Sequence, residues 1–347
     1  MQSTKEATIT RIIETGKISD NDQTKEFQKL ELTIKDTGET VEILHTQEPY
    51  TRWEPYQLNQ QVVVQQPEGL TSWIITDFFR IPALAQLSLI FITLVILIGK
   101  WWGVRSLISL ASSFVVIFGL VLPLIIQGFN PLLITLIGSL IIVPTTFYLS
   151  HGWKVKTHIA IAGTLIALFS AGLLATIFMD NTYLTGFASE EAGFLSVMTK
   201  NQLDIRGLLL AGIIISLLGT LDDVAISQAS FVQQLKEADP QMSFRELFIR
   251  AMRVGQDHIS SMVNTLVLVY AGASLPLLLL FLTSDTSISQ VLNLEIVAEE
   301  IVRTLSGSIG IVLAAPITTL IAASVFTNKK DIPKEPIPRK KKEKFHL

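Results

Sequence analysis

Two adjacent carboxylates, Asp222 and Asp223, stand inside the otherwise apolar segment LLGTLDDVAISQAS. An ionised carboxylate at the centre of a bilayer costs about 2.5–3.5 kcal/mol even on lenient insertion scales. An acid in such a helix is therefore expected to have a partner or a function, such as binding a cation or exchanging a proton. This segment is the first candidate site in the chain.

A polar row on one helical face passes through only one of the two acids. Residues at i, i+3, i+4 and i+7 share a face, and this spacing groups Ser216, Thr220, Asp223, Ser227 and Ser230. Asp222 lies about 100° around the helix from that row. The pattern favours Asp223 as the site residue, with Ser227 and Ser230 beside it.

A second polar row follows in the next apolar run. It contains Asp257, Ser261, Asn264 and Thr265, with His258 beside them. Two helices whose polar rows face each other would shelter these groups from lipid, which predicts a substrate or ion site formed by Asp223, Ser227, Ser230, Asp257, Asn264 and Thr265. The alternative is that serines and threonines only pack helices together, and that Asp257 lies at the membrane surface.

The last apolar run carries small residues at four-residue spacing. Ser306, Gly310 and Ala314 would let a second backbone approach closely. Pro316 then interrupts this pattern, and the hydroxyls of Thr318 and Thr319 are expected to bond the carbonyls that it frees.

Composition indicates which class of protein positions these residues. The chain has 347 residues, of which 49% are hydrophobic and only 16% are charged, whereas soluble domains carry about 25% charged residues. The absence of cysteine excludes disulfides, thiolate catalysis and cysteine-bound metals. The sequence predicts a mostly α, polytopic transmembrane helical bundle preceded by a small β-domain.

Three zones follow from the hydropathy pattern. Residues 1–80 alternate apolar and polar positions, as in a small barrel-like β-domain, with a hairpin turn at Asp36-Thr37-Gly38. Residues 81–327 form the transmembrane domain, and 328–347 form a disordered basic tail. Seven runs approach the roughly 20 residues that span a bilayer: 82–99, 105–127, 131–150, 157–179, 207–231, 259–282 and 305–327.

The distribution of basic residues predicts the orientation. Alternate connections, together with the tail, carry sixteen Lys and Arg residues, whereas the opposite set carries three. By the positive-inside rule, the β-domain is extracytoplasmic and the tail is cytoplasmic. Because the polar start of the chain offers no export signal, we expect a further hydrophobic helix upstream of Met1 or a trimmed chain.

The cytoplasmic segment SFRELFIRAMRVG predicts a helix that begins at a capping box. Ser243 and Glu246 have the required spacing. Its apolar face and its opposite charged face are typical of an interfacial helix that leads into the sixth span.

The motifs GTLDDVAISQAS, VGQDHISSMVNTLVLVYAG and LSGSIGIVLAAPITTLIAA resemble the YibE/F-like family of bacterial multi-spanning membrane proteins. The resemblance covers roughly residues 80–327. It implies a bacterial cell-membrane protein connected with transport, without a defined substrate, and often one more helix ahead of the β-domain. Matched motif by motif, the resemblance implies site residues in the first two motifs: Asp223, Ser227 and Ser230, and Asp257, Asn264 and Thr265. In the third motif it implies the packing or hinge positions Gly307, Gly310 and Pro316. Position 222 departs from the family pattern, in which it is apolar.

Two functional hypotheses remain open at this point. The first is a transporter or permease, coupled to an ion or proton through a buried aspartate. The alternative is a membrane assembly protein that binds a partner through its β-domain. No enzyme motif is present, no cofactor is expected and the metal is unknown. The expected partners are the lipid bilayer and a second copy or a paired protein of the same family, and nucleic acid is not among them.

Overall fold

The structure is a computed structural model that describes residues 4–20, 23–47, 53–67, 72–200, 202–283 and 286–328. The predicted basic tail therefore lies, apart from residue 328, outside the described residues. The chain divides into two compact units, Met1–Ile98 and Gly99–Leu347.

The first unit contains the predicted antiparallel sheet. Its strands are β1 (Lys5–Asp20), β2 (Gln23–Ile34), β3 (Thr40–Thr46), β4 (Gln61–Gln65) and β5 (Ile74–Phe78), in the spatial order β3-β2-β1-β4-β5. The predicted turn joins β2 to β3, where the amide of Gly38 donates to the carbonyl of Ile34. Gly38 has φ +69, a left-handed conformation that glycine adopts without strain.

Alternate residues of these strands bury one face of the sheet. The core contains Ala7, Ile9, Leu30, Leu32, Ile34, Ile43, Tyr56, Val62 and Val64. The backbone of Tyr56 is fixed by the buried side chain of Gln28, which accepts a hydrogen bond from the Tyr56 amide and donates one to its carbonyl. The Tyr56 ring contacts His45 of β3 and Phe78 of β5, so the edge strands curve toward each other around one core.

The helix α1 (Ile81–Val116) is broken at Lys100, whose backbone has φ 50 and ψ −132. The part after the break continues through a π-helical turn, η1 (Ile117–Val121), into α2 (Leu122–Ile126). The two parts of this 46-residue apolar segment correspond to the predicted runs 82–99 and 105–127.

The remaining helices of the second unit are α3 (Pro131–His151), α4 (Val155–Asn181), α5 (Glu190–Met198), α6 (Ile205–Ala238), α7 (Phe244–Ala273), α8 (Leu275–Thr283), α9 (Ile288–Leu292) and α10 (Glu295–Asn328). Within the described residues, five helical segments are long and apolar enough to cross a membrane, or six if the bent pair α7 and α8 is one span. With α1 counted on both sides of its break, this agrees with the predicted transmembrane bundle.

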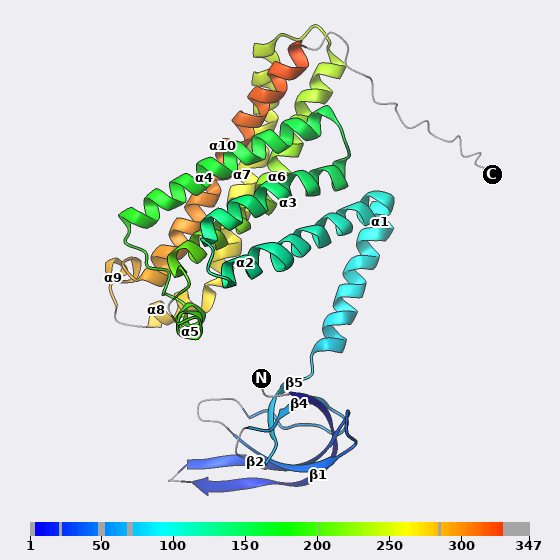
Figure 1. Ribbon diagram of the computed structural model, residues 1–347, viewed down its shortest axis with the longest axis vertical. Helices are drawn as coiled ribbons and strands as arrows, with labels where there is room; N and C mark the ends of the chain where they lie inside the picture. The colour runs from blue at the N-terminus through cyan, green and yellow to red at the C-terminus, as the bar shows by residue number, and fades with distance from the viewer. Residues whose placement is uncertain are drawn as a thin grey trace, which may run out of the picture. The chain divides into compact units, whose positions relative to one another are not determined.

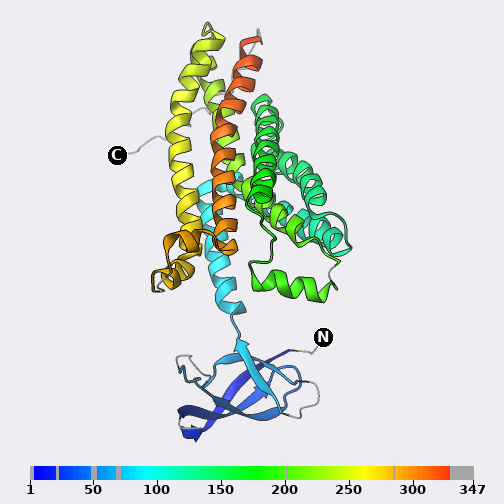
Figure 2. The same cartoon turned by 90° about the vertical axis from the view of Figure 1, so that its left-hand side faces the viewer.

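The core of the bundle lies where α4, α6 and α10 pack against one another, and α7 packs against α6 and α10 (Figure 1). Figure 2 shows α7 and α10 side by side along most of their length. Close helix contacts depend on small residues. A Cβ atom added to Gly163 of α4 would lie 2.1 Å from Thr318 Oγ1 of α10.

The sixth predicted span, 259–282, is bent. Helix α7 ends at Ala273 and α8 leaves at a 62° angle, and together the two helices are long and apolar enough for one span. Pro276 lies in the first turn of α8, and without an amide hydrogen it cannot continue the bonding pattern of α7. The capping box at Ser243 and Glu246 is confirmed.

The predicted interfacial helix is instead the first part of α7. Leu247 and Ala251 on its apolar face are fully buried in the bundle core, so this face packs against protein. A pattern of apolar and charged faces cannot by itself distinguish a lipid surface from a neighbouring helix.

Candidate functional site

A cavity of about 440 Å³ lies among the second part of α1, the end of α3 and the middle of α6. Helix α6 contributes Gly219, Asp222, Asp223 and Ile226, which are spaced at three and four residues and so share one broad face. Both adjacent carboxylates therefore line the cavity.

The other two helices supply mainly hydroxyl groups. Helix α1 contributes Ser106, Ser109 and Ser113, again at helical spacing, together with Trp102 and Leu110. Helix α3 contributes Thr146, Phe147, Ser150 and His151 from its last turns. The cavity thus combines two carboxylates, five hydroxyls and one imidazole within an otherwise apolar bundle.

Hydrogen bonds between α1 and α3 hold this wall of the cavity together. Arg105 donates from Nε to the carbonyl of Leu149 at 2.7 Å and from a terminal nitrogen to the carbonyl of Tyr148 at 3.2 Å. These carbonyls lie in the last turn of α3, and the Tyr148 carbonyl also accepts a bond from the amide of Gly152, which caps the helix. Ser109 adds a bond from its hydroxyl to the carbonyl of Thr146.

The two acids differ in burial. Asp223 is exposed to the cavity side, whereas Asp222 is half-buried. The Oδ1 atom of Asp222 is inaccessible to solvent and has no hydrogen-bond partner among the described residues. A buried carboxylate oxygen without a donor is costly unless a proton or cation compensates it.

Sequence reasoning ranked Asp223 above Asp222 because it searched for polar neighbours on one helix. The polar neighbours of Asp222 come from α1 and α3, so the polar row on α6 could not reveal them. The spacing of Ser106, Ser109 and Ser113 was visible in the second apolar run and could have indicated a polar face there.

The cavity lies toward one end of the apolar layer. Gly207 of α6 packs against Pro131 at the start of α3, where an added Cβ would lie 3.2 Å from Pro131 Cδ. The 21 residues of α3 extend for about 30 Å, which is the thickness of a bilayer core. Because His151 ends α3 and lines the cavity, the carboxylates lie near that end of the layer, away from its centre.

The structure does not bring the other predicted site residues into this cavity. Ser227 and Ser230 are half-buried on α6, outside its lining, and Asp257, Asn264 and Thr265 are exposed on α7. Thr265 donates its hydroxyl to the carbonyl of Ser261 on its own helix. The polar rows of α6 and α7 meet only where the Tyr270 hydroxyl donates to Ser216 Oγ, as far as the described residues show.

Gly307 and Gly310 lie in helix contacts of α10. A Cβ atom on Gly307 would lie 2.9 Å from Leu217 and 3.0 Å from Leu266, and one on Gly310 would lie 3.0 Å from Ala171 Cβ. Pro316 lies inside the continuous helix α10. These positions bring α10 close to its neighbours.

The expected role of Thr318 and Thr319 beside Pro316 is wrong. Thr319 donates its hydroxyl to Gln228 Oε1 of α6, and Thr318 Oγ1 has no partner among the described residues. Gln228 is fully buried between α6, α7 and α10, and a Cβ on Gly255 of α7 would lie 2.0 Å from its Nε2 atom. Sequence reasoning missed Gln228, although an amide inside an apolar run is a detectable signal.

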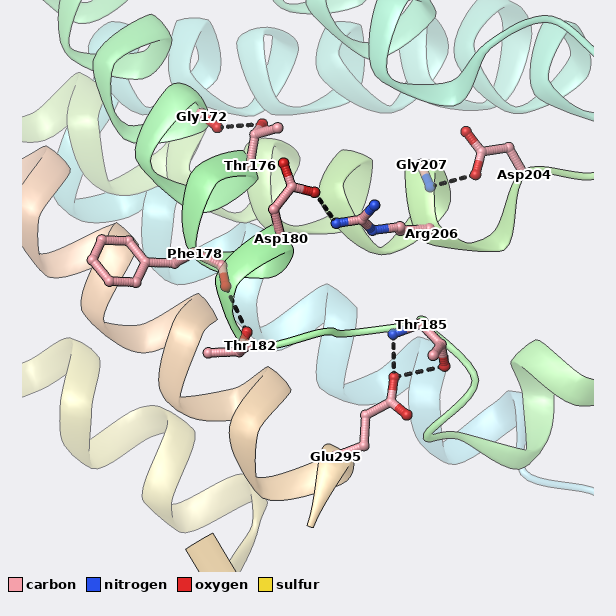
Figure 3. Close-up of polar contacts among 10 residues, drawn as sticks. All are labelled: Gly172, Thr176, Phe178, Asp180, Thr182, Thr185, Asp204, Arg206, Gly207 and Glu295. Atoms are coloured by element: carbon pink, nitrogen blue, oxygen red, sulfur yellow. Dashed lines mark hydrogen bonds and ion pairs between the residues drawn. The ribbon is translucent and has the colours of Figure 1, made fainter. Parts of the chain in front are cut away.

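Several polar groups at the opposite end of the bundle are paired (Figure 3), although Oε1 of Glu299 in α10 is buried there without a hydrogen-bond partner among the described residues. Arg206 at the start of α6 forms an ion pair with Asp180 near the end of α4. Glu295 Oε1 at the start of α10 accepts from the Thr185 hydroxyl at 2.7 Å, from the Thr185 amide and from the Gly186 amide at 3.0 Å. Asp204 accepts from the Gly207 amide at the first turn of α6.

Chemically, the cavity suits a hard cation or a proton. Carboxylate and hydroxyl oxygens are the ligands that alkali and alkaline-earth cations prefer. No group of three or more His, Asp or Glu side chains that could hold a metal ion occurs in the described parts of the chain. Any cation here would therefore rely on two carboxylates and neutral oxygens.

These features define the class of the protein as a membrane-type helical bundle with a polar cavity. Residues 87–328 match the model of the YibE/F-like protein family. The chain belongs to this family, and the resemblance noted in the sequence is confirmed. No curated protein and no solved structure shows significant similarity to the chain.

Proposed function

We propose that the chain is a membrane transporter in which Asp222 and Asp223 bind a small cation or exchange a proton. The observation that carries this proposal is the buried Oδ1 atom of Asp222, which has no hydrogen-bond partner among the described residues and lies in a cavity with Asp223, five hydroxyls and the imidazole of His151. Two neighbouring carboxylates repel each other in a low-dielectric site, and a bound cation or proton relieves that repulsion. Occupancy of the cavity would thereby be coupled to the packing of α1, α3 and α6.

The predicted orientation of the chain indicates on which side of the membrane the cavity lies. The loop after α3 carries Lys154 and Lys156, and the positive-inside rule assigns such loops to the cytoplasm. In the bacterial cell membrane the cavity would then receive its cation or proton from the cytoplasmic side. The paired groups of Figure 3 would lie at the extracytoplasmic end.

The test is charge movement in proteoliposomes on a solid-supported membrane, after jumps of Na⁺, K⁺, Mg²⁺ or pH. Wild-type protein should give a transient current for at least one of these jumps. The double variant Asp222→Asn, Asp223→Asn keeps the shape of the side chains and removes both negative charges, so it should reduce that current by about tenfold or more.

Glu191→Gln is the matched control, because Glu191 is exposed on α5 outside the cavity. Its currents should equal those of wild type. A double variant with undiminished currents, or a wild-type protein without current in any jump, would overturn the proposal.

A further inference from the structure

One face of α7 is exposed and polar in its middle. The residues that share this face are spaced at three and four positions, and all of them are exposed: Arg250, Arg253, Asp257, Ser260, Asn264, Leu268 and Ala271. The opposite face of α7 holds the buried residues Leu247, Ala251, Gly255 and Leu266. Since Gly255 and Asn264 are nine residues apart, they lie on opposite sides of the helix.

Contacts with α6 show where this face of α7 lies along the length of the bundle. Leu217 and Leu266 meet at Gly307, and Tyr270 bonds Ser216, so this part of α7 lies beside the apolar segment of α6. Leu217 is ten residues after Gly207, which corresponds to about 15 Å along the helix. Asn264 is half a turn from Leu266 and therefore lies within the apolar layer, where lipid tails offer no hydrogen-bond partner.

The polar groups at the centre of this face are without a partner in the part of the second unit that the structure describes. Among the described residues, no hydrogen bond or ion pair joins the side chains of Arg253, Asp257 or Asn264 to another group. Asn264 offers two donors and an acceptor. Arg253 and Asp257 lie one helical turn apart and carry opposite charges.

We infer that this face of α7 is the interface between two copies of the chain. A two-fold axis along the membrane normal places the same residues opposite each other. An asparagine amide is self-complementary in that arrangement, because each copy can donate to the other and accept from it. A single asparagine in a seam of three- and four-residue spacing also fixes the register of paired helices.

The charges and side-chain sizes on this face of α7 also fit a second copy of the chain. Arg253 of one copy lies one turn from Asp257 of the other, so the acids are not left facing each other without a cation. Ser260 and Ala271 are small enough for the helices to approach closely on either side of Asn264. The charged, small and amide side chains of this face are therefore complementary to the same side chains of a second copy.

Disulfide cross-linking tests this inference directly, because the chain has no cysteine of its own. Ser260→Cys and Leu268→Cys flank Asn264 on the proposed seam. In native membranes treated with copper phenanthroline, each single-cysteine protein should give a product of twice the 38.4 kDa chain mass. Leu173→Cys on the exposed surface of α4 is the control and should stay monomeric.

A further substitution distinguishes cross-linking at a specific interface from cross-linking by random collision. Adding Asn264→Leu to Leu268→Cys should reduce dimer formation severalfold, whereas Asn264→Gln, which keeps the amide, should preserve it. Cross-linking equal to the Leu173→Cys control, or a product with the mass of a different protein, would overturn the inference. Because the readout is mass, failure of the transport proposal would leave it unaffected.

Discussion

The two ends of the helical bundle treat their charged groups differently. At the end shown in Figure 3, Arg206 pairs with Asp180, and Glu295 accepts bonds from Thr185 and Gly186. At the other end, Asp222 and Asp223 stand side by side in a cavity without a basic side chain in its lining, apart from the imidazole of His151. The same helix, α6, contributes to both ends.

Under the proposed function, this difference separates structural charges from functional ones. A charged group that is already paired within the protein needs no bound ion or proton, so it can hold loops and helix ends in position. Two adjacent carboxylates, of which Asp222 is half-buried, repel each other, and a compensating ion or proton stabilises them. The comparison therefore predicts that changes at the cavity affect function and that changes at the paired end affect stability slightly.

The largest effect is expected from Asp222→Asn alone. Since Asp222 is the more buried carboxylate, loss of its charge should reduce cation- or pH-driven currents about tenfold. Proteoliposome currents provide the measurement, and Arg206→Gln from the paired end serves as the reference with near wild-type currents. Equal losses in both variants would remove the distinction between the two ends.

The next largest effect is expected where α4 packs against α10, between the two ends of the bundle. Gly163→Ala would place a Cβ atom 2.1 Å from Thr318 Oγ1 and 3.3 Å from the Thr318 backbone, and overpacking of this kind costs about 1–3 kcal/mol. The thermal unfolding midpoint in detergent should fall. Gly212→Ala is the matched control, because a Cβ there meets no atom within 4 Å. A midpoint unchanged by Gly163→Ala would show that α4 and α10 are not closely packed.

A smaller effect is expected from a neutral cavity ligand. Ser106→Ala removes one hydroxyl from the lining at an exposed position of α1. The half-saturating cation concentration should rise by a few fold, corresponding to about 0.5–1.5 kcal/mol for one hydrogen bond. Current amplitudes measured over a concentration series give this value, and an unchanged series would exclude Ser106 as a ligand.

The smallest effect is expected at the paired end itself. The side chains of Arg206 and Asp180 are 45% and 58% exposed, and exposed ion pairs contribute about 0–1 kcal/mol. Arg206→Gln should therefore lower the free energy of unfolding by less than about 1 kcal/mol. A large loss of stability would mean that this pair organises the bundle.

Much of the fold could be predicted from the sequence because apolar runs and strand alternation are local patterns. The bounds of α3 and α4 lie within two residues of the predicted runs 131–150 and 157–179. The longer α6 and α10 could not be bounded in this way, since their polar ends continue as helix beyond the apolar run. Whether a polar end stays helical depends on the neighbours that it packs against.

The candidate site was predictable only in part. The unusual acids indicated the segment of α6 that lines the cavity, but the environments of Asp222 and Asp223 depend on side chains from α1 and α3, far away in the sequence. The row on α7 was visible as a pattern, yet a pattern cannot tell which way a helix faces. The exposure of Asn264 and the burial of Gln228 are tertiary properties.

The central claim, that the Asp222 carboxylate takes up a cation or proton, is tested most directly by thermal unfolding of purified protein. The midpoint would be recorded during titrations with Na⁺, K⁺, Mg²⁺ and pH, in wild type and in Asp222→Asn. A ligand at 100 times its Kd stabilises the folded state by about 2.7 kcal/mol, so wild type should show a saturable rise in the midpoint for one of these species that Asp222→Asn lacks. An identical response in both proteins would contradict the account.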